Sequence, residues 1–305
     1  VNARADRKKI ISTRVEHPAI LTTLREYERR GFEIVLIPVD RQGRLDLDFA
    51  TKALDANTAL LTVMWANNEI GNIYPVHELA EMAHRAGALF HTDAVQSVGK
   101  VPVKLDASAI DFLSLSGHKL HGPKGIGVLF VRRGVRFKPF ITGGHQERGR
   151  RGGTENVPGI IGLGKACELA KHELAAEIPA LAALRDRLEQ ELLARIPHSQ
   201  LNGDLASRLP NTSSISFEGI EGEAILSLLN CYGICASSGS ACTTGSLEPS
   251  HVLRAMGIPY TFAHGTIRFS FSKFNTASDV DKVVEVLPGI VETLRKMSPY
   301  WQERK

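Results

Sequence analysis

ALFHTDAVQS (residues 88–97) opens as an apolar run and closes on polar side chains. A run of this length, preceded by a glycine that ends a helical pattern at Gly87, is typical of a buried strand. Similar apolar runs lie at 9–15, 32–39, 59–66, 111–116 and 126–131. Amphipathic helical patterns lie between several of them, at 18–30, 47–55 and 76–87, with Gly31 ending the first. This β-α-β alternation predicts an α/β fold with a mostly parallel sheet covered by helices.

Beyond residue 157 the alternation gives way to a long helical stretch that extends to residue 196. Apolar residues such as Leu181, Leu184 and Leu188 recur there at spacings of three and four, and Pro179 is expected to kink or restart the helix. The patterns that follow are a strand at 211–217, a helix at 221–233, a strand at 266–274 and a helix at 277–297. We therefore expect a large domain over 1–172 and a second, smaller α+β domain over 173–305.

The composition is that of an ordinary globular protein. The 305 residues are 43% hydrophobic and 23% charged, and the formal net charge is +4. The basic residues are scattered along the chain, which does not favour nucleic acid as a partner. The apolar runs are too short for a transmembrane helix and the first residues do not resemble a signal peptide, so we expect no membrane partner. Four cysteines in this length argue against a disulfide scaffold and for a reducing, cytoplasmic setting.

Polar side chains follow four of the predicted strands. They are His17 after the first strand, Asn68 after 59–66, Asp93 and Gln96 after 88–92, and Ser116, His118 and Lys119 after 111–115. Because the carboxyl ends of parallel strands lie at one edge of a sheet, we expect these residues to meet in one crevice. Together they suit pyridoxal phosphate (PLP), whose aldehyde reacts with a lysine and whose ring nitrogen is held protonated by an acid. Lys119, beside Gly117 and Leu120, is expected to be partly desolvated, which favours its neutral, nucleophilic form.

Each of these residues also has an ordinary structural explanation. A lysine such as Lys119 is seldom buried. Asp93 is of a type that often caps the N-terminus of a helix. His17, followed by a proline, is explained equally well as the residue before a helix. Asn68 and Gln96 are of types that are common in loops. The cofactor interpretation is favoured because four strand ends carry such groups together.

Two long motifs carry a family resemblance, HTDAVQSVGK (91–100) and SLSGHKLHGPKGIGVLFVRRG (114–134). They resemble the cysteine desulfurases, which are fold-type I PLP enzymes of the class-V aminotransferase group. The match extends through MWANNEIG (64–71), GGHQERGRRGGTEN (143–156), SSGSACTTGSLEPSHVLRAMG (237–257) and HGTIRFSFS (264–272). RLPNT (208–212), EGEAIL (221–226) and KMSPYW (296–301) are most similar to the NifS type, which supplies sulfur for nitrogenase metalloclusters. The resemblance implies the PLP-dependent transferase fold, and it leads us to expect that an N-terminal segment precedes residue 1 in the complete protein.

The resemblance also assigns roles around the cofactor ring. Lys119 would form the Schiff base, and Asp93 would pair with the pyridinium nitrogen. His17 would stack on the ring and move protons. Gln96 would bond the ring oxygen, and Asn68 would lie near that oxygen and the substrate.

Further roles concern the cofactor phosphate and the substrate. The resemblance implies that Ser116 and His118 bind the phosphate, and that Thr154 reaches the phosphate of the other subunit of a homodimer. Thr154 also lies where a helix is expected to begin, and helix N-termini bind phosphate. Arg268 lies in an otherwise apolar strand pattern and resembles the clamp for the substrate carboxylate. A planar guanidinium suits a carboxylate, although an ordinary interdomain salt bridge would also explain it.

Cys242 lies among Ser, Gly, Ala and Thr residues, which tolerate turns and cannot build a core. Such a stretch suits a mobile loop with a reactive thiol. By resemblance, Cys242 would take sulfur from L-cysteine as a persulfide, leave L-alanine, and deliver the sulfur to a NifU-like or IscU-like scaffold. Cys231, Cys235 and Cys242 are spaced poorly for a permanent metal site, and the first two, like Cys167, look structural. By resemblance, Cys242 is also a candidate ligand of a transient iron–sulfur cluster shared with the scaffold.

Two other functions are open at this point. One is a selenocysteine lyase or a relative that prefers cysteine sulfinate, which would share the fold and Lys119. The other is a non-catalytic protein of sulfur assembly that keeps the fold without turnover. The extended loop around Cys242 favours a desulfurase over both.

Overall fold

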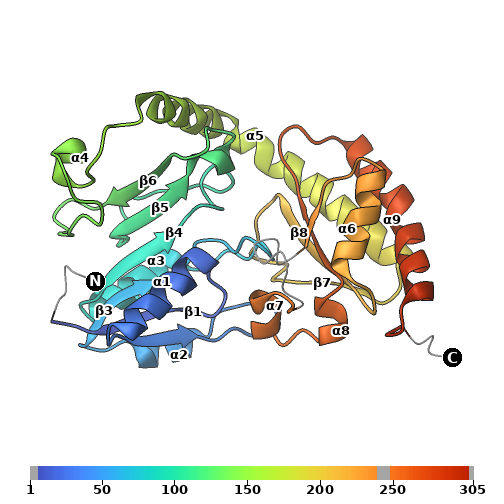
Figure 1. Cartoon of the computed structure of the whole chain (residues 1–305), viewed down its shortest axis with the longest axis horizontal. Helices are drawn as coiled ribbons and strands as arrows, with labels where there is room; N and C mark the ends of the chain where they lie inside the picture. Colours follow the sequence, from blue (N-terminus) through green and yellow to red (C-terminus); the bar gives the residue numbers. More distant parts are fainter. Residues whose placement is uncertain (1–5, 239–247, 302–305) are drawn as a thin grey trace. The chain divides into compact units, whose positions relative to one another are not determined.

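The computed structural model describes residues 6–238 and 248–301, in which the chain forms two compact units (Figure 1). The first unit comprises Val1–Ile37, Asp46–Ala66 and Tyr74–Leu174. The second comprises Pro38–Leu45, Asn67–Ile73 and Ala175–Lys305. Two short segments from the strand-rich part of the sequence therefore belong to the second unit.

The first unit is built on a six-stranded sheet in the order β2-β1-β3-β4-β5-β6 (Figure 1). Its strands are β1 (Lys9–Thr13), β2 (Glu33–Ile37), β3 (Thr58–Thr62), β4 (Leu89–Asp93), β5 (Phe112–Ser116) and β6 (Gly127–Val131). β1 to β5 run parallel, and β6 pairs antiparallel with β5. Ile11, Leu61 and Phe90 are fully buried, as central strands covered on both faces require. The predicted mostly parallel sheet is confirmed.

Helices cover this sheet. α1 (Pro18–Arg29) and α2 (Leu47–Ala53) pack against β2, and α3 (Val76–Arg85) packs against β3 and β4. Gly31 and Gly87 have φ of +83° and +69° directly after the C-caps of α1 and α3, which confirms their predicted place at the helix ends. A 3₁₀ helix, η2 (Gly117–Leu120), follows β5, and α4 (Gln146–Gly149) precedes the long helix α5 (Val157–Arg195).

The second unit has an antiparallel sheet in the order β7-β8-β10-β9. Its elements are β7 (Ser199–Leu201), β8 (Thr212–Phe217), α6 (Gly222–Cys231), β9 (Ser237–Ser238), α7 (His251–Ala255), α8 (Tyr260–Ala263), β10 (Thr266–Ser270) and α9 (Ala277–Met297). Its core joins the sheet to the helices through residues such as Leu188, Phe217, Ile225, Ile267 and Leu287. The predicted second, α+β part of the fold is confirmed.

Two expectations about this region are corrected. α5 continues through Pro179, so the helix does not restart there. The strand expected over 266–274 ends at Ser270, because the chain then turns: Ser272 N donates to Asn275 Oδ1 at 2.8 Å and Asn275 N donates to Ser272 O at 2.9 Å. The short elements β7, β9 and α8 have too few residues to show a periodicity, and the sequence does not predict them.

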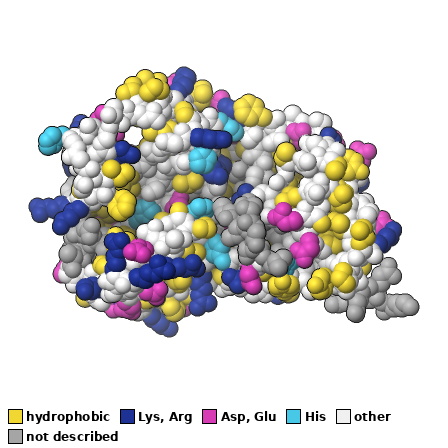
Figure 2. Space-filling model, viewed as in Figure 1, with side chains coloured by type: hydrophobic (Ala, Val, Ile, Leu, Met, Phe, Trp, Pro, Cys, Tyr) yellow, Lys and Arg dark blue, Asp and Glu magenta, His cyan; other side chains and the backbone are white. Residues whose placement is uncertain are grey.

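Both signs of charge are distributed over the surface. On the face shown in Figure 2, Lys and Arg side chains lie among Asp and Glu side chains, in line with the small net charge. Among the helices that the structure describes, none is both long enough and apolar enough to cross a membrane.

Candidate active site

The site of the first unit lies where β4 and β5 end. These parallel neighbours pair Asp93 with Ser114, so their carboxyl ends lie side by side. β4 ends at Asp93 and β5 ends at Ser116. Lys119 follows directly in η2. The sheet therefore brings the candidate acid, hydroxyl and lysine to one edge, as the strand order requires.

Asp93 is a half-buried carboxylate. Its Oδ1 accepts a hydrogen bond from Val95 N at 2.9 Å, and its carbonyl accepts one from Trp65 N at 2.8 Å. Burial raises the pKa of Asp93, while the Val95 N–H and the charge of His17 act in the opposite direction. Residues 95–100 form turns rather than a helix, so Asp93 caps a turn and is not a helix N-cap.

His17 is the N-cap of α1. Its Nδ1 accepts a hydrogen bond from Ala19 N at 3.2 Å, and Pro18 takes the first helical position, which suits proline. Because Nδ1 is an acceptor, the neutral ring carries its proton on Nε2. His17 therefore leads into its helix, as the structural explanation proposed, and its charge also acts on Asp93.

Ser116 and His118 form a hydrogen-bonded pair, with Oγ and Nδ1 2.9 Å apart. Lys119 is exposed, whereas its neighbours Gly117 and Leu120 are buried. The expectation that Lys119 is partly desolvated is therefore wrong for this chain without a cofactor. Gly117 and Leu120 pack into the unit, and the side chain of Lys119 stays in solvent.

Gln96 and Thr154 lie in the same unit. Gln96 is partly buried, and its Oε1 accepts a hydrogen bond from Lys100 Nζ at 3.1 Å. Thr154 is exposed and does not begin a helix, which corrects the expectation. α5 begins at Val157, and Asn156 supplies the capping oxygen to Gly159 N at 3.1 Å.

Glu16 is a buried carboxylate that the sequence analysis missed. It is fully buried, and its Oε1 accepts hydrogen bonds from Met64 N at 2.7 Å and from Thr13 Oγ1 at 3.3 Å. Burial raises its pKa to about 8, the negative charge of Asp93 adds to the effect, and the two hydrogen bonds oppose it. The available signal was a glutamate directly before a predicted site histidine, His17.

The second unit holds the candidate substrate residues. Arg268 lies on β10, and its Nη1 donates to Asn68 O at 2.6 Å. Glu69, which sequence reasoning also missed, is buried beside them and accepts a hydrogen bond from Ser250 Oγ. The structure thus brings Asn68 and Arg268 together within this unit, while Asp93 and Lys119 belong to the first.

The described cysteines separate into an exposed pair and a partly buried residue. Cys242 lies outside the described residues. Cys231, at the end of α6, and Cys235 are exposed, so the expectation that they are structural is wrong: Ile234 and Ala236, not the cysteines, pack against the core in this segment. Cys167 is partly buried on α5, and burial raises its pKa.

The first-unit residues fit PLP by their chemistry. The cofactor needs an acid for its ring nitrogen, an amine for its aldehyde and donors for its phosphate. Asp93, Lys119 and the Ser116–His118 pair supply these groups at adjacent strand ends. Burial disfavours the charged form of Asp93, and a protonated ring nitrogen beside it would offset that effect.

Comparisons with known proteins show the family of the chain. The aminotransferase class-V family model matches residues 2–283. A cysteine desulfurase of Gluconacetobacter diazotrophicus is 62% identical over 302 residues, which cover 99% of this chain and 76% of the relative. Cysteine desulfurase NifS of Azotobacter vinelandii is 56% identical over 301 residues, which cover 99% and 75%. The chain therefore spans about three quarters of the length of these relatives.

Solved structures give the same result. A NifS-like protein superposes with a TM-score of 0.89 at 38% identity, covering 96% of this chain and 77% of the other. A NifS-like protein from Rickettsia africae superposes with a TM-score of 0.85 at 31% identity, covering 94% and 76%. The family resemblance noted in the sequence is confirmed. The chain belongs to the aminotransferase class-V family, among its PLP-dependent cysteine desulfurases.

Proposed function

We propose that this protein converts L-cysteine to L-alanine and transfers the sulfur to Cys242 as a persulfide, for iron–sulfur or nitrogenase metallocluster assembly. The observation that carries the proposal is the partly buried carboxylate of Asp93 at the end of β4, beside the Ser116–Lys119 segment at the end of β5. The names of the relatives favour cysteine over selenocysteine or cysteine sulfinate, and catalysis over a non-catalytic role.

The first unit holds the groups that would bind the cofactor. When bound, PLP supplies an electrophilic aldehyde and an electron-withdrawing ring that activates bonds beside the substrate nitrogen. The amine of Lys119 would bind the cofactor covalently at its aldehyde carbon, and the carboxylate of Asp93 would keep a proton on the ring nitrogen. Gln96 would bond the ring oxygen, and Asn68, which belongs to the second unit, would lie near that oxygen.

Phosphate binding and proton transfer would involve four further residues of this unit. The Ser116–His118 pair would bind the phosphate, and Thr154 would reach the phosphate of a partner subunit. His17 would stack on the ring. Because its Nδ1 is held by Ala19 N, proton exchange with the substrate runs through its Nε2.

The substrate step uses Arg268 and Cys242. Arg268 would bind the substrate carboxylate through its guanidinium, with Asn68 nearby. Protonated Cys242 and L-cysteine give the Cys242 persulfide and L-alanine: the carbon–sulfur bond of the substrate breaks and a sulfur–sulfur bond forms at Cys242. His17 and Lys119 move the proton from sulfur to carbon, so the reaction needs no external oxidant or reductant.

We propose that residues 1–172 bind the cofactor and residues 173–305 carry the reactive cysteine. A homodimer is supported by exposed apolar side chains of the first unit, which include Val128, Leu129, Phe140, Ile160 and Ile161. A NifU-like or IscU-like scaffold would accept the sulfur, and Cys242 would transiently bind an iron–sulfur cluster with it. The small number of cysteines supports a cytoplasmic location.

The intact mass of the protein tests this function. The PLP-loaded protein is incubated with L-cysteine, and we expect a gain of one or more sulfur atoms that a thiol reductant removes, together with L-alanine. Cys242→Ala should gain no sulfur. Cys235→Ala, which removes an exposed cysteine of the same unit, should behave like the wild type. Loaded wild type that forms neither persulfide nor alanine would contradict the proposal.

A further inference from the structure

The turn at 67–73 of the second unit has a well-defined shape. Asn67 Oδ1 accepts hydrogen bonds from Glu69 N at 2.8 Å and Ile70 N at 3.0 Å. Its backbone closes the turn, because Asn67 N donates to Asn72 O at 2.8 Å and Gly71 N donates to Asn67 O at 3.1 Å. The carbonyl of Asn68 and the side chain of Glu69 are therefore held in place by the turn itself.

This turn contacts the candidate carboxylate clamp. Arg268 is the central residue of β10, paired with Ser214 on one side and Ser237 on the other. Its Nη1 donates to Asn68 O at 2.6 Å, one residue before Glu69. The backbone of Arg268 is thus fixed by the sheet, and the position of its guanidinium depends on the turn.

Glu69 is anchored on its other side by α7. Its exposed fraction is 6%, and it accepts a hydrogen bond from Ser250 Oγ. Ser250 is itself 5% exposed and caps α7 by accepting a hydrogen bond from Val252 N at 3.0 Å. A buried carboxylate of this kind needs a countercharge, and among the described residues Arg268 supplies the charge that acts on it.

We infer that Glu69 is a positioning residue for Arg268: its carboxylate is the resting countercharge of the guanidinium, and it competes with the substrate carboxylate for that cation. The inference rests on the proposed function, in which Arg268 binds the substrate. Asn68 O and Glu69 together hold the guanidinium before the substrate arrives.

Protonation of Glu69 then controls how strongly it competes. Burial raises the pKa of Glu69 to about 7, although the hydrogen bond from Ser250 and the charge of Arg268 both act to lower it. Below pH 7 Glu69 is mostly neutral, so the Arg268 guanidinium can bind the substrate carboxylate. Above pH 7 the ionised Glu69 competes with the substrate carboxylate for that guanidinium, so the KM for L-cysteine rises as the pH passes 7.

The test compares wild type with Glu69→Gln as PLP-loaded proteins between pH 6 and pH 8.5. Glutamine keeps the shape and removes the charge, so its KM at pH 8 should be about fivefold lower than that of the wild type, with little change in kcat. The rise in KM through pH 7 should also disappear. Titration calorimetry with L-alanine, which carries the same carboxylate, should show the same difference without turnover.

Two further variants support this test. Ser250→Ala removes a hydrogen bond that lowers the pKa of Glu69, so the rise in KM should move to higher pH. The Ser250→Ala variant therefore tests the inference even if Glu69→Gln does not fold. Glu285→Gln makes the same charge change at an exposed residue of α9 and should leave KM and its pH profile unchanged.

The outcomes separate this inference from the proposed function. Wild type that makes alanine, with the KM profiles of Glu69→Gln and Ser250→Ala parallel to its own, would overturn the role of Glu69 and leave the desulfurase intact. Wild type that makes no alanine would overturn the proposed function. The L-alanine titrations would then decide about Glu69 alone: unchanged affinity in Glu69→Gln would reject the inference.

Discussion

Glu16 is the buried residue with the largest expected effect of pH on stability. Its pKa lies near 8 in the folded chain and near 4.5 when exposed. At a pH between these two pKa values, Glu16 is protonated in the folded state and ionised in the unfolded state. Unfolding therefore releases a proton, and the free energy of unfolding falls as the pH rises through this window.

We predict that Glu16→Gln removes this loss of stability. At pH 5 the variant and the wild type should have similar free energies of unfolding, because a protonated glutamate resembles glutamine. As the pH rises to 8, the free energy of unfolding of the variant should exceed that of the wild type by an amount that grows by up to about 1.4 kcal/mol per pH unit. Urea unfolding at pH 5, 6.5 and 8 measures it.

Glu28→Gln is the matched control, since Glu28 is an exposed glutamate on α1. Its difference from the wild type should stay within about 0.5 kcal/mol at every pH. A pH-independent difference for Glu16→Gln as well would mean that Glu16 is ionised in the folded chain, contrary to this account.

At the scale of a single element, α9 shows how a helix start is fixed. Thr276 and Asp279 form a capping box, in which Thr276 N donates to Asp279 Oδ2 at 2.8 Å. This bond is the main reason why the pKa of Asp279 is lowered. The helix that begins here buries Val280, Leu287 and Val291 in the core of the second unit.

We expect Asp279→Ala to lower the free energy of unfolding by about 1 kcal/mol at pH 7, because it exposes the unpaired N–H of Thr276. Asp279→Asn keeps an acceptor oxygen and should lose less. Because the lowered pKa means that the charged form stabilises the fold, the gap between wild type and Asp279→Ala should narrow as the pH falls below 3.8. Equal losses in the two variants would show that the acceptor oxygen of residue 279 contributes nothing to the cap, and no loss in either would show that the cap itself contributes nothing.

At the scale of the whole molecule, the second unit is assembled from distant parts of the sequence. Arg44 Nε donates to Asp204 Oδ2 at 2.9 Å, across 160 residues of chain. Asn72 accepts from Asp204 N at 2.7 Å and donates to Gln42 O at 2.8 Å. The unit is therefore complete only when 38–45 and 67–73 join residues from beyond 175.

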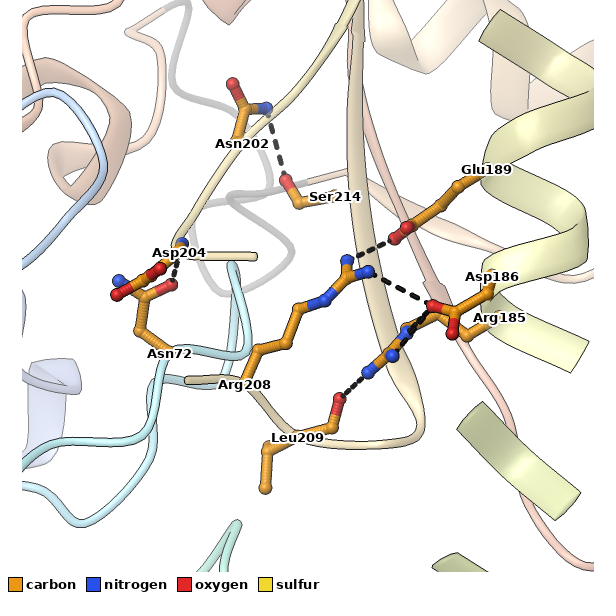
Figure 3. Close-up of polar contacts among 9 residues, drawn as sticks. All are labelled: Asn72, Arg185, Asp186, Glu189, Asn202, Asp204, Arg208, Leu209 and Ser214. Carbon is orange, nitrogen blue, oxygen red and sulfur yellow. Dashed lines mark hydrogen bonds and ion pairs between the residues drawn. The ribbon is translucent and has the colours of Figure 1, made fainter. Parts of the chain in front are cut away.

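An ionic network, buried except at Asp186, holds the segment that meets the 67–73 turn (Figure 3). Arg208 donates to Glu189 Oε1 at 2.7 Å and to Asp186 Oδ1 at 3.1 Å, both on α5. Arg185 donates to Leu209 O at 2.5 Å. Leu209 N in turn donates to Gly71 O at 2.8 Å, so the network supports the turn that carries Glu69.

We predict that Glu189→Leu destabilises the protein by about 3 kcal/mol, because it leaves the Arg208 guanidinium buried without its closest carboxylate. The double variant with Arg208→Leu should be less destabilised than the sum of the two single variants, by at least 0.5 kcal/mol. A urea double-mutant cycle at pH 7 measures this coupling. Additive losses would show that the pair is not coupled.

Much of the fold could be predicted from the sequence because its signals are local. The six strands of the first unit are apolar runs, and α9 is bounded by Thr276 and Met297 within the expected limits. β9 has two residues and no recognisable pattern. The places of 38–45 and 67–73 in the second unit depend on contacts such as Arg44–Asp204, which no local pattern encodes.

The candidate site could be predicted only in part, for the same reason. Asp93 and Lys119 were found because they follow strands whose order fixes a common edge. Glu16 and Glu69 were missed because a carboxylate next to a site residue has no sequence signature of burial. The exposure of Lys119 was missed because the burial of Gly117 and Leu120 does not extend to the two residues between them.

The pairing of β9 with β10 limits the reach of Cys242, the proposed carrier of the sulfur. Ser238 is held opposite Ile267, beside the arginine proposed to bind the substrate. Four peptide units separate Ser238 from Cys242, and an extended chain advances at most about 3.6 Å per residue, so this tether is no longer than about 14 Å. If Cys242 carries the sulfur as proposed, its Cα stays within this distance of Ser238 as long as β9 stays paired. Under that proposal, delivery calls for an acceptor that docks on the enzyme and meets the thiol there.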